Sequence, residues 1–285
     1  WSSDVCSSDL WRLPAVVVPG HGRLLVFASG KDRTNAAAPL HSNFSISAAG
    51  ERIVLTAPNG APAGELPAWP VPRDVAIGRL PDGSTNIVFL ARPTPKSANT
   101  APGYSAVSRM PAFSFAGGFF ENPFSVALST PDPGTVIRFT LDGSEPVESS
   151  PLYAGPIPLT DRNAEPNILS LIRGTATVNQ HTDGWFPPSG LVAKATSIRA
   201  RAFRPGAMPS EVATRTWFIG TNSPTRFQVP VLSLVTDTNG LFDYVRGIYV
   251  LGKIFDDYRA AHPAEPLTGH TPANYQGRGD AWTRP

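Results

Sequence analysis

The sequence lacks long apolar runs and has few charged residues. No stretch of 18 apolar residues occurs, so the sequence predicts no segment that spans a membrane. Charged residues make up 16% of the 285 residues, whereas about 25% is typical of globular proteins. The 24 Lys and Arg residues barely exceed the 22 Asp and Glu residues. Because the basic residues are also scattered along the chain, we expect no nucleic-acid partner.

Cysteine is nearly absent, and the single Cys6 lies in a segment that we interpret as foreign to the protein. Residues 1–10 are rich in Ser and Asp and correspond to the translation of a common sequencing-adapter oligonucleotide. We therefore exclude them from the fold as an adapter-derived artefact. The rest of the chain has no thiol, which excludes disulfides, thiol catalysis and zinc–thiolate sites. On this interpretation, we expect the true N-terminus and any signal peptide to be missing.

The sequence also lacks the short motifs of common catalytic sites. It contains no Gly-rich phosphate-binding loop ending in Gly-Lys-Ser/Thr, no His-Glu-x-x-His zinc motif and no Gly-x-Ser-x-Gly nucleophile turn. Its five histidines are well separated along the chain, so a metal cluster would need several of them to converge in the fold. We therefore predict no catalytic, cofactor-binding or metal-binding residue in this chain.

Glycine and proline, in contrast, are abundant. The chain has 25 Gly and 31 Pro residues, together about a fifth of the total, where roughly 12% is usual. Hydrophobic residues reach 41%, which is enough to build a packed core. A turn-rich, charge-poor sequence of this kind favours short strands joined by tight loops. We therefore expect an all-β fold.

Alternating apolar and polar residues mark individual strands, because successive side chains of a strand point to opposite faces. The alternating segments are residues 44–48, 124–128, 137–141, 198–202 and 214–218. Asn59-Gly60, Asp82-Gly83 and Asp142-Gly143 lie between apolar runs. These dipeptides favour the positive φ angles of hairpin turns. This spacing of strands and turns indicates β-sandwiches.

Two stretches are predicted to lie outside the sandwiches. Residues 100–109 belong to a nearly uncharged, Pro-, Ser- and Gly-rich segment, which is typical of a linker. Residues 161–190 lose the strand periodicity and are interpreted as an insertion. Within the insertion, Pro166–Ile172 predicts a single helical turn.

The residues after 220 change in character. Val231–Val235 and Gly247–Val250 are rich in aliphatic and β-branched residues and predict two short strands. Residues 253–262 predict a helix, because acidic residues come early, Arg259 comes late, and Pro263 follows. We therefore expect an α+β segment at this end of the chain.

Four short segments between residues 11 and 99 form a recognisable pattern. They are Leu24–Arg33, Leu40–Phe44, Ile77–Gly83 and Pro93–Asn99. Together they resemble a bacterial lamin-tail domain. The resemblance implies an immunoglobulin-like sandwich that serves as a structural or interaction module. The opening strands of that family have no counterpart here, so we expect a truncated copy over residues 11–99.

A second pattern spans most of residues 110–220. It consists of Phe139–Pro146, Ser150–Ile157 and Ile198–Phe203, in that order. These segments resemble the C-terminal β-sandwich domain of chitobiase and β-hexosaminidase, which implies an accessory domain without the glycosidase carboxylates. Its structural motif residues are Asp142 and Gly143 in a hairpin turn and Tyr153, an aromatic anchor beside a bend.

A third pattern lies in residues 221–285. It consists of Pro230–Thr236, Leu241–Asp243, Gly247–Gly252 and Asn274–Pro285, the last of which contains the motif residue Trp282. These segments are similar to the N-terminal start of CotH-type proteins, spore-coat-associated and atypical kinase-like proteins. The resemblance implies that ATP and divalent metal act in a core further downstream. None of their ligands can be placed on this sequence.

The predicted fold is thus all-β, with two consecutive immunoglobulin-like or fibronectin-III-like sandwiches followed by an incomplete α+β segment. We expect a non-catalytic spacer or adhesion region of a bacterial extracellular or cell-surface protein. Its partner would be an unknown protein or a cell-wall carbohydrate. Two alternatives stay open: the N-terminal portion of a CotH-type protein kinase, and a carbohydrate-binding accessory module.

The carbohydrate alternative depends on aromatic rings that sugars can stack against. Trp185 and Phe186, in the predicted insertion, are the candidate ligand platform. Trp69 and Trp217 are further aromatic candidates, but Trp217 lies in a closing strand and is expected to be part of the core.

Overall fold

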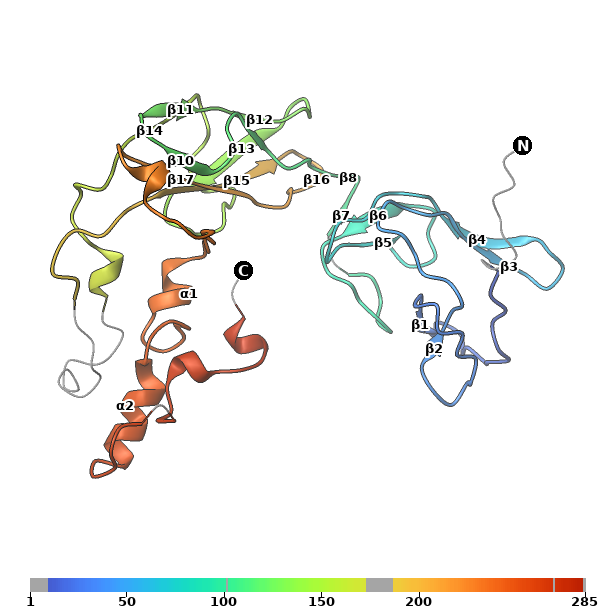
Figure 1. The fold of residues 1–285 in the computed structure, drawn as a ribbon. Coiled ribbons are helices and arrows are strands. Elements are labelled where there is room, and N and C mark those ends of the chain that lie inside the picture. The colour runs from blue at the N-terminus through green and yellow to red at the C-terminus, as the bar shows by residue number, and fades with distance from the viewer. Residues whose placement is uncertain (1–9, 101, 173–186, 269, 284–285) are drawn as a thin grey trace. The chain divides into compact units, whose positions relative to one another are not determined.

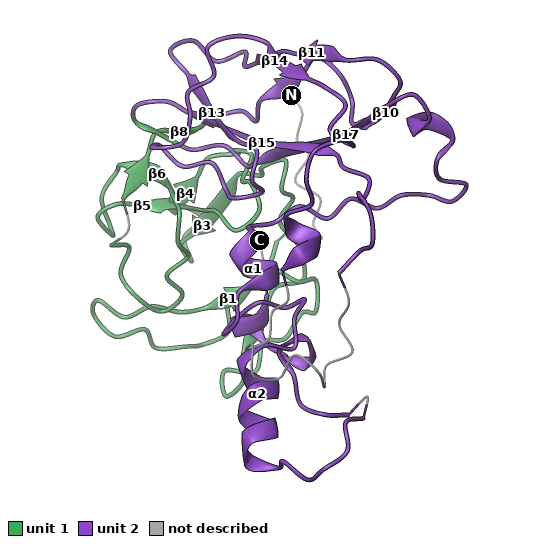
Figure 2. Cartoon of the chain, turned by 90° about the vertical axis from the view of Figure 1, so that its left-hand side faces the viewer, with its two compact units in different colours: residues 1–107, 206–208 green, residues 108–205, 209–285 purple. Residues whose placement is uncertain are grey.

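The computed structural model describes residues 10–100, 102–172, 187–268 and 270–283. Within these ranges the regular elements are mostly strands, with few helices, which confirms the prediction of a β-rich fold. The chain divides into two compact units (Figure 2). Unit 1 comprises Trp1–Val107 and Gly206–Met208, and unit 2 comprises Ser108–Pro205 and Pro209–Pro285.

Unit 1 consists of short strands joined by turns (Figure 1). The predicted Asn59-Gly60 turn joins β3 (Ile53–Thr56) to β4 (Pro62–Leu66) in an antiparallel hairpin. Gly60 has a φ of 83°, as such a turn requires. A three-stranded antiparallel sheet contains, in order, β5 (Ala76–Arg79), β6 (Ile87–Leu90) and β7 (Gly103–Tyr104). Two parallel pairs complete the unit: β1 (Val26–Phe27) with β2 (Leu40–His41), and β8 (Ala106–Val107) with β16 (Ala207–Met208).

Two expectations for this part of the chain differ from the structure. The alternating residues 44–48 form no strand and make only an isolated bridge, between Ser45 and Ser29. The predicted linker, residues 100–109, contains β7 and β8. Each of these two-residue strands finds a partner strand, so a Pro- and Ser-rich composition alone does not prevent pairing.

The principal sheet of unit 2 has four strands. In order they are β10 (Gly118–Phe120), β17 (Ala213–Ile219), β15 (Thr196–Phe203) and β13 (Val136–Thr140). β10 runs parallel to β17, and the other neighbours are antiparallel. Two antiparallel pairs accompany the sheet: β11 (Phe124–Val126) with β14 (Ile157–Leu159), and β9 (Ala112–Phe113) with β12 (Leu128–Ser129).

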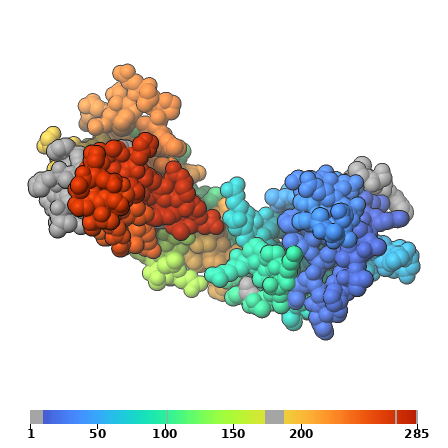
Figure 3. All heavy atoms as spheres, turned by 90° about the horizontal axis from the view of Figure 1, so that it is seen from below, coloured from blue at the N-terminus to red at the C-terminus, as the bar shows by residue number. Residues whose placement is uncertain are grey.

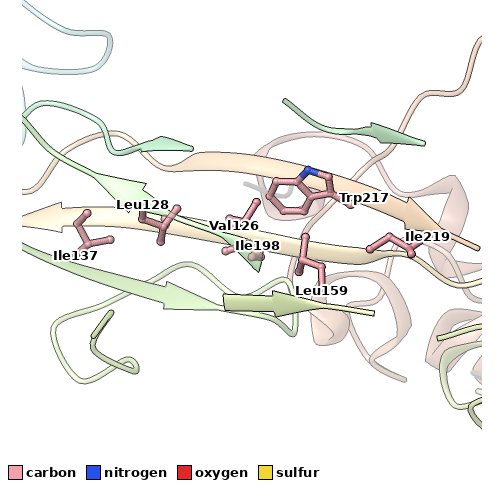
Figure 4. Packing of buried hydrophobic residues seen from close by; sticks show 8 residues of the cluster. Val126, Leu128, Ile137, Leu159, Ile198, Trp217 and Ile219 are labelled. Carbon is pink, nitrogen blue, oxygen red and sulfur yellow. The ribbon is translucent and has the colours of Figure 1, made fainter. Parts of the chain in front are cut away.

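The core of unit 2 lies between this sheet and the paired strands (Figure 4). The alternation predicted for residues 198–202 is present: Ile198 and Ala200 are fully buried, whereas Arg201 lies on the other face and is half-buried. The sheet and the pairs contribute eight buried residues to one cluster: Val126, Leu128, Ile137, Leu159, Ile198, Ala200, Trp217 and Ile219. Burial of this apolar surface is the main force that holds the strands together.

The remainder of unit 2 has helices and turns. The predicted helix over residues 253–262 is present as α2 (Gly252–Ala261). A shorter helix, α1 (Thr238–Phe242), precedes it, and η2 (Leu169–Leu171) lies in the helical turn predicted at 166–172. Three further 3-10 turns are η4 (Ser223–Thr225), η5 (Asn274–Gln276) and η6 (Asp280–Trp282). In Figure 3 the red atoms of α2 and the turns that follow it gather into one body.

The prediction of an α+β segment after residue 220 was wrong for the described residues. Within 221–268 and 270–283 the structure has no strand, and Val231–Val235 and Gly247–Val250 are irregular. Leu232 and Leu234 are 83% and 80% exposed, so they face no partner strand. In the described ranges, no helix is both long and apolar enough to cross a bilayer.

Candidate functional site

The Asp142-Gly143 turn reverses the chain after β13. Gly143 has a φ of 83°, a conformation that glycine adopts without steric cost. The Asp142 carboxylate accepts hydrogen bonds from the Ser144 hydroxyl at 2.6 Å and the Ser144 backbone N–H at 3.0 Å. These bonds hold the pKa of Asp142 below its ordinary value. The returning chain then follows the outer edge of β13, where Pro151 accepts from Phe139 N–H at 3.1 Å.

A buried arginine in the neighbouring strand β15 forms hydrogen bonds to this turn. Arg199, on β15, is only 5% exposed. Its Nη1 donates to the Gly143 carbonyl at 2.9 Å, and its Nη2 lies 3.4 Å from the Glu145 carboxylate. A Cβ at position 143 would lie 2.3 Å from the Thr236 carbonyl oxygen. The motif residues thus form a tightly packed structural corner with no open space for a ligand beside Gly143.

Tyr153 joins the chain after the turn to the core. Its backbone N–H donates to the Ile137 carbonyl at 2.9 Å, and its ring packs against the core cluster. Its hydroxyl accepts a hydrogen bond from the Leu128 backbone N–H at 3.0 Å. Tyr153 therefore links β12 to the edge of β13. Its ring packs in the core, and its hydroxyl accepts a hydrogen bond from a buried backbone amide.

Removal of this hydroxyl is expected to destabilise unit 2. In Tyr153→Phe the ring still packs, but the buried Leu128 N–H loses its partner, so the free energy of unfolding should fall by about 1–3 kcal/mol. Urea unfolding followed by near-ultraviolet circular dichroism measures the loss. The matched control is Tyr249→Phe, because Tyr249 is 75% exposed and should change stability by less than about 0.5 kcal/mol. Equal effects of the two substitutions would contradict the role given to Tyr153.

Two asparagines close the base of the predicted insertion. The Asn163 side chain accepts from Lys194 N–H at 3.0 Å and donates to the Ile219 carbonyl at 3.1 Å. The Asn167 side chain donates to the Gly190 carbonyl at 2.8 Å and accepts from Val192 N–H at 3.1 Å. The two ends of the insertion are thereby joined to each other, and Asn163 fixes them to the end of β17. Trp185 and Phe186, the candidate ligand platform, lie outside the described residues.

The other aromatic candidates are packed within the protein. Trp217 is fully buried, as expected, and its Nε1 donates to the Ala116 carbonyl at 2.9 Å. Trp69 stacks on Phe89 with ring centroids 5.2 Å apart. Sequence reasoning did not single out a partly exposed aromatic group on the sheet, in which Phe227 lies against Phe119 and Phe218. Its rings come from three separate segments, so no local pattern could reveal it.

A single buried asparagine organises the residues around α2. Asn274 is fully buried, and its amide donates to the Tyr244 carbonyl at 3.0 Å. Its side-chain carbonyl accepts from Ile254 N–H at 3.2 Å, in the first turn of α2. The predicted motif residue Trp282 lies nearby, where a Cβ on Gly277 would lie 2.2 Å from its ring. Only glycine fits at position 277 beneath this ring.

Asp243 caps the turn between α1 and α2. Its carboxylate accepts from the backbone N–H groups of Arg246 and Val245, each at 2.9 Å, and these bonds lower the pKa of Asp243. A lowered pKa means that the folded state binds its proton less readily than the unfolded state. The turn is therefore stabilised above the ordinary carboxyl pKa of 3.8, and the stabilisation is lost as pH falls through the folded-state pKa.

This behaviour predicts a pH-dependent difference between the protein and Asp243→Asn. The amide keeps the acceptor oxygen but does not titrate, so the stability advantage of the wild type should be largest near pH 6 and shrink progressively below about pH 4. Urea midpoints at several pH values measure the difference, and the carboxyl carbon shift of Asp243 gives the pKa directly. A difference that stays constant down to pH 2.5 would contradict the prediction.

In unit 1 two of the four segments of the first sequence pattern, 77–83 and 93–99, meet at Asn99. Its side-chain amide donates to the Arg79 carbonyl at 2.8 Å, and its backbone N–H donates to the Asp82 carboxylate at 3.2 Å. The Thr94 hydroxyl donates to its side-chain oxygen at 2.7 Å. Arg23 forms an ion pair with Asp82, and this bond is the main cause of the lowered pKa of Asp82. Residues distant in sequence thus form one hydrogen-bonded network.

The described residues contain no group of three or more His, Cys, Asp or Glu side chains placed to hold a metal ion. The contacts above give the motif residues structural roles. Asp142 and Gly143 lie in the turn after β13 and Tyr153 lies beside the start of that strand, whereas Trp282 belongs to the group around α2.

Comparison with known proteins supports one of the three resemblances. No curated protein and no solved structure matches the chain. The lamin-tail and CotH resemblances, over residues 11–99 and 221–285, stay predictions. The match to a known family begins just before β10. It includes the Asp142-Gly143 turn and Tyr153, and it ends within the insertion. Residues 115–168 match the family model of the chitobiase/beta-hexosaminidase C-terminal domain.

Proposed function

We propose that this chain is a non-catalytic structural and interaction region of an extracellular or cell-surface protein. In it, the module around residues 115–168 acts as a carbohydrate-associated accessory domain. The observation that carries the proposal is the family match over 115–168, because the matched family takes its name from enzymes of carbohydrate breakdown. Fold alone does not determine function, so the proposal needs a direct binding test.

The internal structure of unit 2 suits a scaffold. Its core surrounds the fully buried Trp217. The Asp142-Gly143 turn is stabilised by a hydrogen bond from the buried Arg199. The two ends of the insertion are joined by hydrogen bonds, in which Asn163 accepts from Lys194 N–H and Asn167 accepts from Val192 N–H. Segments that are held at their ends by a rigid scaffold commonly contain binding residues. These features support an interaction role for the insertion.

The carbohydrate role is tested with the whole chain. Pull-down on insoluble chitin, cellulose and peptidoglycan, followed by a glycan array, should show retention of the protein on at least one polysaccharide. Trp185→Ala should reduce that retention at least about tenfold, since one stacked aromatic ring contributes on the order of 1–2 kcal/mol. Trp11→Ala is the matched control. Absence of binding to every polysaccharide would overturn the carbohydrate part of the proposal.

We further propose that residues 11–99 form a lamin-tail-like immunoglobulin-type module and that residues 221–285 correspond to the start of a CotH-type domain. Two segments of the first pattern meet at Asn99, and the bond from Asn274 N–H to the Leu251 carbonyl joins two segments of the third pattern; both observations support these assignments. The chain itself is expected to transfer no phosphate. Incorporation of labelled phosphate from ATP and Mg²⁺ or Mn²⁺ by the purified chain would contradict its non-catalytic character.

A further inference from the structure

The other two segments of the first sequence pattern, 24–33 and 40–44, meet at His41. β1 and β2 lie side by side (Figure 1), and His41 is the second residue of β2. On the other edge of β2, Arg33 lies directly opposite His41 in an isolated antiparallel bridge. The two residues exchange backbone hydrogen bonds of 2.9 and 3.0 Å. Because opposed residues of an antiparallel pair project to the same side, the Arg33 and His41 side chains lie near each other.

The half-buried ring of His41 is held by two neighbours. Phe27, in β1, stacks on it with ring centroids 5.0 Å apart. The Ser29 hydroxyl lies 2.8 Å from Nδ1, within hydrogen-bond distance. Among the described residues, none provides a hydrogen-bond partner for the other ring nitrogen, Nε2. The ring is therefore fixed in position, with one nitrogen left for a ligand.

Two exposed cations, Lys31 and Arg33, lie close to this ring. Partial burial lowers the pKa of His41 below 6.5, and the positive charges of Arg33 and Lys31 lower it further. In the part of the chain that the structure describes, neither cation forms a side-chain hydrogen bond or an ion pair. Asp32, between them in sequence, has its carboxylate bound to the Trp11 indole N–H at 3.0 Å. The site thus gathers three basic groups that have no carboxylate partner in the described ranges.

From this arrangement we infer that Lys31, Arg33 and His41 together bind a phosphate group. A guanidinium donates to two phosphate oxygens at once, and a lysine ammonium adds a compact positive charge. The Nε2 of His41 donates a further hydrogen bond when the ring is charged. An anion among the three groups also offsets their mutual repulsion. The inference concerns unit 1 and does not depend on the carbohydrate role proposed for unit 2.

Binding of the anion is linked to the protonation of His41. A negative charge beside the ring favours its charged form, so a bound phosphate should raise the pKa of His41 by about one unit. By thermodynamic linkage, the anion then binds about tenfold more tightly to the protein in which His41 is charged. The affinity should therefore increase as pH falls through the pKa of His41.

The test follows the Cε1–H resonance of His41 in the full chain by NMR, and His41→Gln identifies this resonance by its loss. Inorganic phosphate, added at constant ionic strength, should shift the resonance saturably and raise the pKa of His41. Glucose 6-phosphate should act in the same way, whereas glucose and chloride should not. Tighter binding of glucose 6-phosphate would assign the site to sugar phosphates, and equal or weaker binding would assign it to free phosphate. If both phosphates leave the pKa of His41 unchanged, the proposal is overturned.

Variants of the protein locate the site. Lys31→Glu and Arg33→Glu change exposed side chains, so they should preserve the fold and each weaken phosphate binding at least about tenfold. The matched control is Lys96→Glu, the same charge change at an exposed lysine that does not act on the pKa of His41. Sulfate, whose charge is constant in this range, should bind the wild type about tenfold more tightly at about pH 5 than at about pH 8, and His41→Gln should remove this difference. If Lys96→Glu weakens binding as much as Lys31→Glu does, the protein attracts an adventitious ion only, and the proposal fails.

Discussion

Substitution of Trp217 by Ala is expected to lower the free energy of unfolding of unit 2 by about 3–5 kcal/mol. Trp217 is fully buried in the centre of the core cluster, and its ring lies 5.5 Å from that of Phe113. The substitution removes the largest side chain of the core and leaves a cavity that the surrounding strands fill only in part. It also leaves the Ala116 carbonyl without its indole donor. Since a domain has a total stability of about 5–15 kcal/mol, this is a large fraction.

Urea unfolding of unit 2 measures this loss. Trp217→Phe keeps most of the volume and loses the hydrogen bond, so it should fold and lie between the wild type and Trp217→Ala. Phe218→Ala serves as the matched control, because Phe218 is the next residue of β17 and lies on the opposite, half-exposed face. If Phe218→Ala lowers the free energy of unfolding as much as Trp217→Ala does, the core does not lie on the Trp217 face of β17.

The second large effect is expected at Asn274. In Asn274→Ala the Tyr244 carbonyl and the Ile254 N–H both lose their buried partner, at a cost of about 1–3 kcal/mol each. The residues around α2 have a small core of their own, in which Val250, Phe255 and Ala273 are buried. Loss of this one side chain should therefore cause local unfolding of α2 while the four-stranded sheet stays folded.

Amide hydrogen exchange can separate these two regions. Asn274→Ala should accelerate exchange throughout α2, and exchange in β15 and β17 should stay unchanged. Asn274→Asp keeps an acceptor for Ile254 N–H but removes the donor to Tyr244, so its effect should be intermediate. Tyr275→Ala, at the exposed neighbouring residue, is the control. Protection of α2 that survives Asn274→Ala would show that the asparagine does not organise this region.

The strands of unit 2 were predictable because their own sequence contains the signal. Residues 137–141 and 198–202 alternate strictly, and they form the antiparallel neighbours β13 and β15. Residues 231–235 have equal β-propensity but form no strand, because strand formation requires a partner as well as a suitable sequence. At Gly247 the backbone instead makes a tight turn, in which its N–H donates to the Asp243 carbonyl at 2.7 Å.

The candidate sites were less predictable than the strands. Asp142, Gly143 and Tyr153 could be singled out, since a turn and its aromatic neighbour are close in sequence. The functions of Asn99 and Asn274 depend on residues up to 20 and 30 positions away. The ion pair between Arg23 and Asp82 joins residues that are 59 positions apart. Features built from such distant segments appear only when the chain is folded.

The returning chain along β13 has a consequence for solubility. Among the residues that the structure describes, two backbone bonds occupy that edge of the sheet, from Phe139 N–H to the Pro151 carbonyl and from Tyr153 N–H to the Ile137 carbonyl. The covering segment pairs with β13 only from Pro151 to Tyr153, so it offers only a short template to another molecule. The sheet of unit 2 is thereby protected on this side against edge-to-edge aggregation, a hazard for any β-rich protein kept at high local concentration.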